Sequence, residues 1–418
     1  MAVCLSCFCF FKGSPVENAE PTLHFILTAP NGRMEIFMNI YLDHAATTPL
    51  SPPMQQYLSS LLHDFGNPSS LYSLGLHTKS IIENARRNTA AFIHASRQDV
   101  FFTGGGSASN TLAIKGYCSR HDCNIFYSPL AHKSILKCAA SCKKSRPLKV
   151  DKKGFLDLND LEKQLYEQSK TPFVIIEYAN SEIGTIQPVD EIIQIVHRHK
   201  GIIYIDCTGS IPSIPFDVKN TDVDMCGFSA HKLGALKGCG VFYKKSSIDI
   251  EPLIYGAQEQ GLWGGTENVL GIASLGKALE HYDYSFVSSK NRDYVYDFIR
   301  TSIPGAYLVG SLTNRLPHHL YICFQGIEGE ALMMLLDMKG IQVSTGSACN
   351  AGNLSASDAL SAIGMNEKDI HSCIRITFSG RETKEELDYF CRNLKESVNR
   401  LKSMNKIKYP YKQHKADL

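Results

Sequence analysis

Neither sign of charge dominates this 418-residue chain, because 43 Lys and Arg residues balance 41 Asp and Glu residues and leave a formal net charge of +2. A chain without a basic or acidic excess has no electrostatic footprint for nucleic acid or for a membrane surface, so we expect neither partner. Internal repeats and low-complexity tracts are absent, and Trp occurs once. What remains is the composition of an ordinary globular protein, long enough for two or three domains.

Cysteine is plentiful, but a disulfide framework is absent. The 14 cysteines are scattered through the chain without the regular spacing of a small secreted scaffold. Such usage suits a reducing compartment, and we therefore expect a cytoplasmic protein. No matching cluster of metal ligands follows Cys4, Cys7 and Cys9 near the start, so we expect no metal site.

Residues 1–37 stand apart from the rest of the sequence. The segment from Ala2 to Phe11 is mostly apolar, yet it lacks a basic start and is too short to cross a membrane. Met34 and Met38 come just before the first segment with a recognisable pattern. We therefore interpret residues 1–37 as a disordered or mis-started extension.

Short apolar runs alternate with helix-like segments through the first part of the chain, which is typical of an α/β fold with a mostly parallel sheet. We expect a large domain over residues 51–285 and a smaller α+β domain formed by residues 38–50 and 286–418. Expected strands cover residues 99–102, 124–128, 173–178, 201–206, 223–228, 241–243, 320–324 and 374–378. Expected helices cover residues 53–63, 79–93, 111–117 and 282–303.

A short polar turn places Ser229, His231 and Lys232 directly after one apolar run and before a glycine-rich stretch and a second run. This order predicts a strand, a tight turn and a strand, with the lysine held rigidly at a strand end. A lysine that is desolvated there is partly neutral and can form a Schiff base with a carbonyl group. Taken alone, the Ser-x-His-Lys pattern favours a solvated turn residue at Lys232.

A carboxylate ends the preceding buried strand. Asp206 closes the apolar run that begins at Gly201, and an Asp at the carboxyl end of a strand faces the ligand crevice of an open α/β sheet. Pyridoxal phosphate is bound by such a pair, an Asp at the end of one strand and a Lys, here Lys232, after the following strand. The carboxylate keeps the ring nitrogen protonated, and the lysine holds the aldehyde.

A glycine-rich turn, Thr103-Gly-Gly-Gly-Ser-Ala-Ser-Asn110, supplies a third signal. The free amides at a helix start, together with the hydroxyl of Ser107, can hold a phosphate group because unpaired donors and the positive end of the helix dipole meet there. A glycine turn by itself is weak evidence for such a site.

Together these motifs resemble the cysteine desulfurases of the class V aminotransferase family, in the subgroup with a long cysteine-bearing loop. The resemblance runs from about Ile40 to about Phe390, and each motif is weak alone whereas their joint order is specific. The motifs are Tyr41-Leu-Asp-His-Ala-Ala-Thr-Thr48, Gly66-Asn-Pro-Ser-Ser70, Phe102-Thr-Gly-Gly-Gly-Ser107, Asn180-Ser-Glu-Ile-Gly184, the Asp206 strand, Ser229-Ala-His-Lys232, Gly265-Thr-Glu-Asn268, Ser344-Thr-Gly-Ser-Ala-Cys349 and Ile374-Arg375.

The resemblance implies the type I fold of pyridoxal-phosphate-dependent transferases, with a seven-stranded, mostly parallel sheet in the large domain. Thr266 would reach the phosphate of a neighbouring subunit, so a homodimer is expected. His132 would stack on the cofactor ring and take part in proton transfer, although alone it could be an idle His at a helix start. The implied cofactor-binding residues are Gly106, Ser107, His132, Asp206, Ser229, His231, Lys232 and Thr266.

The same resemblance implies that Cys349, on the small-residue loop 343–357, is the nucleophile, and that Asn180 and Arg375 hold the substrate. The expected reaction converts L-cysteine to L-alanine with Lys232 as the base. The sulfur stays on Cys349 as a persulfide for an acceptor protein, such as an iron–sulfur scaffold, or for tRNA thiolation. Without the family context, Asn180 could be a turn residue and Arg375 a surface ion pair.

Two positions depart from the family pattern. Gly209 stands where a Gln would bond the ring oxygen, and Trp263 stands where the family has an Arg. These changes predict a slow desulfurase, and Gly209→Gln should raise turnover if the neighbouring backbone leaves room. A selenocysteine lyase-like enzyme and a catalytically weak scaffold for sulfur-assembly partners stay open as alternatives.

Overall fold

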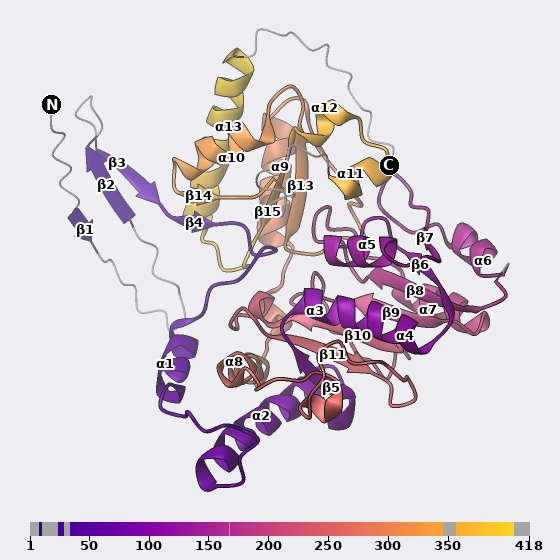
Figure 1. The fold of residues 1–418 in the computed structure, drawn as a ribbon. Coiled ribbons are helices and arrows are strands. Elements are labelled where there is room, and N and C mark those ends of the chain that lie inside the picture. Colours follow the sequence, from indigo (N-terminus) through magenta and orange to yellow (C-terminus); the bar gives the residue numbers. More distant parts are fainter. Residues whose placement is uncertain (1–7, 11–23, 29–33, 167, 346–356, 405–418) are drawn as a thin grey trace. The chain divides into compact units, whose positions relative to one another are not determined.

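The computed structural model describes residues 8–10, 24–28, 34–166, 168–345 and 357–404, which form two compact units (Figure 1). The large unit comprises Ala45–Tyr284 and Gly310–Leu316. The small unit comprises Met1–His44, Ser285–Val309 and Pro317–Leu418. In the described segments, no helix combines the length and the apolar character needed to cross a membrane.

The large unit is built on a seven-stranded sheet with the strand order β5-β11-β10-β9-β8-β6-β7. Strand β11 runs antiparallel to both of its neighbours, and the other neighbouring pairs are parallel. The predicted α/β class with a mostly parallel sheet is therefore confirmed. The strands are β5 (Val100–Thr103), β6 (Cys123–Tyr127), β7 (Ser145–Pro147), β8 (Thr171–Glu177), β9 (Ile202–Asp206), β10 (Met225–Ser229) and β11 (Gly240–Lys244).

Helices cover both faces of this sheet, because its central strands are apolar on both sides. In β8, Val174 and Ile176 join the core cluster formed with α2, α6, α7 and α8, whereas Phe173 and Ile175 join the cluster on the other face, formed with α5 and the helical stretch after Gly105. The helices are α1 (Pro52–Leu61), α2 (Ser73–Phe92), α3 (Gly106–Thr111), α4 (Tyr117–Arg120), α5 (Lys133–Ala140), α6 (Leu158–Tyr166), α7 (Val189–Arg198) and α8 (Val269–Leu279).

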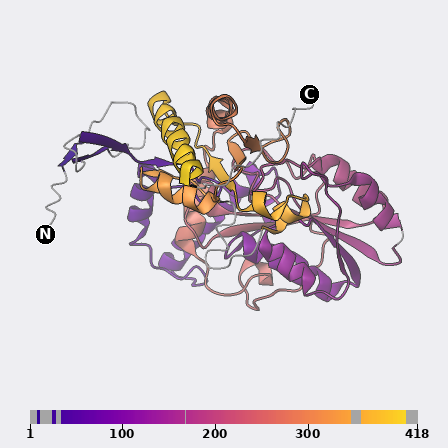
Figure 2. The same ribbon diagram turned by 90° about the horizontal axis from the view of Figure 1, so that it is seen from above.

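The small unit combines short sheets with helices. Its core packs α9, α10 and α13 against the sheet β12-β13-β15, and Figure 2 shows α13 beside α10. Near the start of the chain, β1, β2 and β3 form an antiparallel sheet, and β4 pairs with β14. The strands are β1 (Phe8–Phe10), β2 (His24–Thr28), β3 (Met34–Met38), β4 (Ile40–Tyr41), β12 (Ala306–Leu308), β13 (His319–Phe324), β14 (Ile341–Gln342) and β15 (Cys373–Thr377). The helices are α9 (Lys290–Ser302), α10 (Gly329–Asp337), α11 (Asp358–Ala362), α12 (Glu367–Ile370) and α13 (Lys384–Met404).

Three helices begin well away from the expected positions. The helix expected at residues 79–93 begins at Ser73. The helix expected at residues 111–117 already begins at Gly106 and continues through a π-helical turn, Leu112–Gly116. Its polar first turn hides the helix from a sequence pattern, because Ser109 and Asn110 are buried and hydrogen-bonded to distant partners. The helix expected from Tyr282 begins instead at Lys290, since the Tyr282 hydroxyl donates to Pro212 of the large unit.

Candidate active site

The predicted cofactor residues of the large unit follow the carboxyl ends of neighbouring strands. Asp206 ends β9, and a single 3-10 turn directly after β10 carries Lys232. Strands β9 and β10 are parallel and adjacent, so both groups belong to one edge of the sheet. His132 follows β6 and Gly106 follows β5, and the carboxyl ends of these strands lie at the same edge.

Asp206 is a buried carboxylate, 5% exposed, that is held by two donors. Its Oδ2 accepts from Asn110 Nδ2 at 2.8 Å, and its Oδ1 accepts from the backbone N–H of Thr208 at 2.9 Å. The Asn110 Oδ1 in turn accepts from the Tyr204 hydroxyl at 2.6 Å. Hydrogen bonds of this kind offset the cost of removing a carboxylate from water, and they fix its orientation.

Ser134 links His132 to the same network. The Ser134 hydroxyl accepts from Asn110 Nδ2 at 2.9 Å and lies 2.8 Å from Nδ1 of His132, while the Ser134 backbone N–H donates to that Nδ1 at 3.2 Å. Because Nδ1 accepts, the neutral ring carries its proton on Nε2. His132 thereby caps helix α5 as well.

The electrostatic surroundings keep His132 neutral at neutral pH. The side chain reaches solvent, yet protein atoms around the ring remove part of its hydration, and this desolvation lowers the pKa of His132. Asp206 opposes this shift and Lys232 reinforces it. The charges of Asp206 and Lys232 therefore both act on the His132 ring at this edge of the sheet.

Hydroxyl groups surround the start of helix α3. The Gly106 backbone N–H donates to Oγ of Ser229 at 2.8 Å. A Cβ atom on Gly106 would lie 2.8 Å from this Oγ and 2.9 Å from Oγ1 of Thr208, so only glycine fits between them. Oγ1 of Thr208 is buried and has no hydrogen-bond partner among the described residues. A helix start with an orphaned hydroxyl beside it fits the phosphate group of the expected cofactor.

The turn that carries Lys232 is clamped by two threonines. Thr48 donates from its N–H and its hydroxyl to the carbonyl of His231, at 3.1 and 2.8 Å, and accepts from the Gly234 N–H at 2.8 Å. Nδ1 of His231 lies 3.0 Å from the hydroxyl of Thr47. Burial, together with the nearby charges of two lysines, lowers the pKa of His231 to about 4, so this ring is neutral.

Asn180 is buried, and its side chain is occupied by contacts within its own turn and with Leu130. Its Nδ2 donates to the carbonyl of Leu130 at 2.7 Å and to Oε1 of Glu177 at 3.4 Å. Its Oδ1 accepts from the N–H groups of Glu182 and Ile183. These contacts are those of a turn residue, and the substrate-binding role of Asn180 stays a prediction.

Of the other predicted residues, three belong to the described segments and one lies outside them. Ser107 is exposed on the first turn of α3, and Thr266 is exposed in the loop before α8. Arg375, on β15 of the small unit, is buried and donates to Oδ1 of Asp43 at 2.8 Å. Cys349 lies within residues 346–356, outside the described part of the chain.

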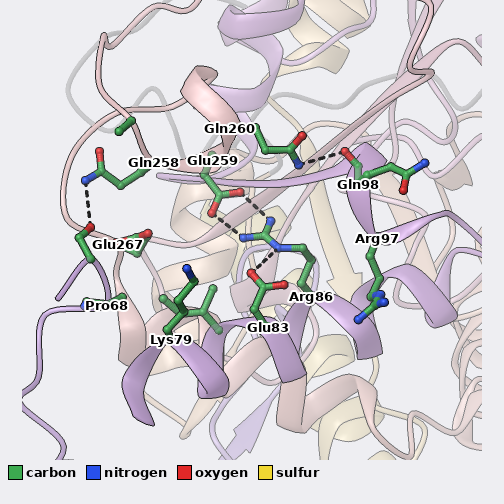
Figure 3. A pocket seen from close by; sticks show the side chains of 13 residues that line it. Pro68, Lys79, Glu83, Arg86, Arg97, Gln98, Gln258, Glu259, Gln260 and Glu267 are labelled. Carbon is green, nitrogen blue, oxygen red and sulfur yellow. Dashed lines mark hydrogen bonds and ion pairs between the residues drawn. The ribbon is translucent and has the colours of Figure 1, made fainter. Parts of the chain in front are cut away.

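A pocket of about 620 Å³ lies beside the loop that leads to Thr266 (Figure 3). At its wall, Arg86 donates to both carboxylate oxygens of Glu259, at 2.7 and 2.8 Å, and the Phe102 N–H donates to Oε2 of Glu259. Glu259 and Gln260 both have positive φ angles, 47° and 57°, which are unfavourable for these residues. The buried ion pair with Arg86 therefore holds a strained loop in place.

The two departures from the family pattern have different surroundings. A Cβ atom on Gly209 would lie 2.9 Å from the backbone carbonyl oxygen of Ala179, so the space that the Gly209→Gln prediction requires is absent. Trp263 is half-buried, packs against the core cluster under α3 and α5, and lies 3.8 Å from the Cβ position of Gly104. Its indole therefore covers part of the glycine-rich turn.

Sequence comparison identifies the family. The model of the family described as Aminotransferase class-V matches residues 40–390. The chain belongs to this family. The resemblance drawn from the motifs is thus confirmed, and the match spans both structural units.

Similar proteins carry desulfurase names. The chain is 37% identical over 388 residues to "Cysteine desulfurase IscS" of Dictyoglomus turgidum, covering 90% of this chain and 97% of the relative, and 35% identical to the protein of the same name from Methanosarcina thermophila, covering 88% and 94%. A solved structure described as "NIFS-LIKE PROTEIN" superposes with a TM-score of 0.80 at 30% identity, covering 87% of this chain and 100% of that one. The structure of "SspA in complex with cysteine" superposes with a TM-score of 0.72 at 26% identity, covering 82% and 100%.

Asn110, Ser134, Thr208 and Thr48 have structural roles at the site that the sequence analysis did not assign. Asn110 and Thr48 are the last residues of two of the motifs given above, but nothing at either position indicates which residues it contacts. The partner of Asn110 is 96 residues away and that of Thr48 is 183 residues away, so no local pattern connects them.

Replacing Asn110 by Ala should destabilise the protein by about 3 kcal/mol, because it leaves the Tyr204 hydroxyl and one oxygen of Asp206 buried without these partners. Urea unfolding of the cofactor-free protein measures this change. Ser119→Ala, at an exposed hydroxyl on the neighbouring α4, is the control and should have little effect. An Asn110→Ala protein as stable as the wild type would contradict the role given to this amide.

Replacing Gly209 by Gln should lower stability by about 1–3 kcal/mol and should not raise turnover, because even the first side-chain carbon meets the Ala179 carbonyl. Gly209→Ala isolates that contact and should show a similar loss. Lys219→Gln adds the same side chain at an exposed position and serves as the control. Faster alanine release by Gly209→Gln would refute this correction and restore the expectation drawn from the sequence.

Proposed function

We propose that this protein is a pyridoxal-phosphate-dependent cysteine desulfurase that converts L-cysteine to L-alanine and transfers the sulfur to an acceptor. The observation that carries the proposal is the pair Asp206 and Lys232 at the ends of adjacent parallel strands. The family match and the desulfurase names of its relatives support the same chemistry.

The residues at the sheet edge divide the binding of the cofactor among them. Lys232 would hold its aldehyde, and Asp206 would keep a proton at its ring nitrogen. The Gly106 amide, Ser229 and His231 would bind its phosphate group, joined by the hydroxyl of Thr208. When bound, pyridoxal phosphate supplies an electron sink that weakens the Cα–H bond of the amino acid.

The chain's own groups carry out the proton and sulfur transfers. The amine of Lys232 takes the α-proton of cysteine as a general base. The thiolate of Cys349 attacks the substrate sulfur, so that an S–S bond forms as the substrate C–S bond breaks. The electron pair of the broken bond stays with the substrate, whose β-carbon takes up a proton, and alanine leaves. His132, whose Nδ1 accepts from the Ser134 backbone N–H and which therefore carries its proton on Nε2, would exchange a proton with the reacting amino acid. Arg375 and Asn180 are our candidates for holding the substrate.

We propose an iron–sulfur scaffold or the tRNA thiolation pathway as the destination of the sulfur, and the cytoplasm as the location of the enzyme. The thiol of Cys349 must be reduced before it can attack the substrate, and a reducing compartment keeps it so. Ten cysteines of the described segments, from Cys118 to Cys391, are free thiols, which agrees with such a compartment.

We also infer that the protein works as a homodimer. Six large apolar side chains in residues 62–76 are more than two fifths exposed, and Tyr255, in the loop before Thr266, is 74% exposed. Exposed apolar side chains in such number favour an interface. The six are Leu62, Phe65, Leu71, Tyr72, Leu74 and Leu76.

The purified protein, supplied with cofactor and a reductant, should release alanine and sulfide from L-cysteine. Cys349→Ser should still bind the cofactor, as its absorbance will report, but should lose alanine release by at least about a hundredfold because the nucleophile is gone. The control is Cys142→Ser, which should retain activity. Cys142 is a half-buried thiol just after the C-terminal end of α5, whereas His132 caps the N-terminal end of this helix. Normal desulfuration by Cys349→Ser would refute its assignment, whereas a wild type with no turnover would favour the scaffold alternative.

Mixing Lys232→Ala and Thr266→Ala subunits should recover activity that neither variant has alone at limiting cofactor. If Thr266 completes the site of the neighbouring subunit, one site of each hybrid dimer is intact and the other carries both changes. Thr301→Ala, at an exposed position of α9, replaces Thr266→Ala in the control mixture. Without sharing, each hybrid site carries one lesion, so a lack of recovery would count against the shared site.

A further inference from the structure

A second carboxyl group lies beside Asp206 and has no part in the mechanism above. Glu177 is the last residue of β8, and in the parallel pairing of β8 with β9 it is the register partner of Asp206. Paired residues on neighbouring strands project from the same face of a sheet. Glu177 is 5% exposed, so two buried carboxyl groups end adjacent strands at the proposed active site.

The hydrogen bonds of the two carboxyl groups differ. Asp206 accepts from Asn110 at 2.8 Å and from a backbone N–H at 2.9 Å. Oε1 of Glu177 accepts from the Ser128 hydroxyl at 3.2 Å and from Asn180 Nδ2 at 3.4 Å. Oε2 of Glu177 is buried and has no hydrogen-bond partner among the described residues.

The surroundings of Glu177 favour the neutral acid. Ser128, after β6, and Asn180, after β8, are uncharged, and the charge that acts on Glu177 is that of Asp206 on β9. Asp206 and Lys232, on the turn after β10, both act on His132 at the start of α5. Burial, aided by repulsion from Asp206, raises the pKa of Glu177 to about 7 against the opposing hydrogen bonds.

We propose that Glu177 is a positioning residue that stays a neutral carboxylic acid in slightly acidic solution. Its ionisation in more alkaline solution places a second negative charge beside Asp206. That charge makes the loss of the proton from the cofactor's ring nitrogen less favourable. The last step rests on the proposed function, whereas the protonation of Glu177 itself does not.

Because Glu177 is buried, its ionisation lowers the stability of the folded protein. The folded protein holds the Glu177 proton more tightly than the unfolded chain, in which an ordinary Glu has a pKa of about 4.5. The protonated Glu177 therefore stabilises the folded protein fully at a pH below the pKa of Glu177 in the unfolded chain. This stabilisation is lost as the pH rises through the pKa of Glu177 in the folded protein. At about pH 7 half of the folded molecules have lost this proton, and at about pH 8 both states are almost fully ionised and the loss is nearly complete.

The first test compares the unfolding of the cofactor-free wild type with Glu177→Gln, an uncharged side chain of the same length. From about pH 5.5 to about pH 8, the folding equilibrium constant of the wild type should fall about thirtyfold relative to that of Glu177→Gln. Glu191→Gln, at an exposed carboxylate on α7, is the control and should show no such relative change. A constant ratio between wild type and Glu177→Gln across this range would overturn the proposal.

The second test needs no folded variant. The infrared spectrum of the cofactor-free wild type at slightly acidic pH should contain the band of a buried protonated carboxylic acid, and the band should disappear as the pH rises past neutrality. Where Glu177→Gln folds, its spectrum should lack the band throughout. A wild type without the band would refute the neutral acid whatever the variant does.

The third test addresses the link to Asp206 and uses the protein loaded with cofactor. The absorbance of the bound cofactor should titrate with a lower midpoint pH in Glu177→Gln than in the wild type, because one negative charge fewer holds the ring-nitrogen proton. Equal midpoints would overturn the link to Asp206. Failure of the protein to bind the cofactor would instead count against the proposed function, since the first two tests do not depend on it.

Discussion

The hydrogen bond from Asn110 to Asp206 is the interaction on which the candidate site depends. A buried carboxylate needs donors, and Asn110 supplies one from the first helix after β5, while the same amide accepts from Tyr204 on β9 and donates to Ser134 on α5. One side chain thus ties together three elements. Because the amide, the hydroxyls and the carboxylate are all directional, a shift of any one element would leave several buried polar groups unpaired at once.

This constraint explains the conformation of the chain after β5. Gly105, with a φ of 142°, turns the chain so that the helix begins at Gly106 and presents Asn110 to the sheet edge. Ser109 on the same turn donates to the carbonyl of Val241 on β11. The helix is therefore held by contacts with three strands, and its start is the part that meets Ser229 and Thr208.

Much of the fold could be predicted from the sequence, because five-residue apolar runs ending in Asp206 or leading to Lys232 mark both the strands and their functional ends. The order of the motifs along the chain identified the family. Partners such as Ser134 and Thr208 could not be predicted, since they become neighbours only when distant strands align. Gly209 shows a different limit: the sequence reveals that a side chain is missing, but not that the Ala179 carbonyl occupies its space.

Glu177 carried the same signal as Asp206, a carboxyl group at the end of a buried strand, and only the structure separates the two. Desolvation acts on both, so the donors decide the difference: Asp206 receives close hydrogen bonds from an amide and from the backbone, whereas Glu177 receives longer ones on a single oxygen. An ion is stable in a dry site only where donors replace its water. The sheet edge therefore supports one carboxylate in its charged form, and the donors favour Asp206, the carboxylate next to the strand that leads to Lys232.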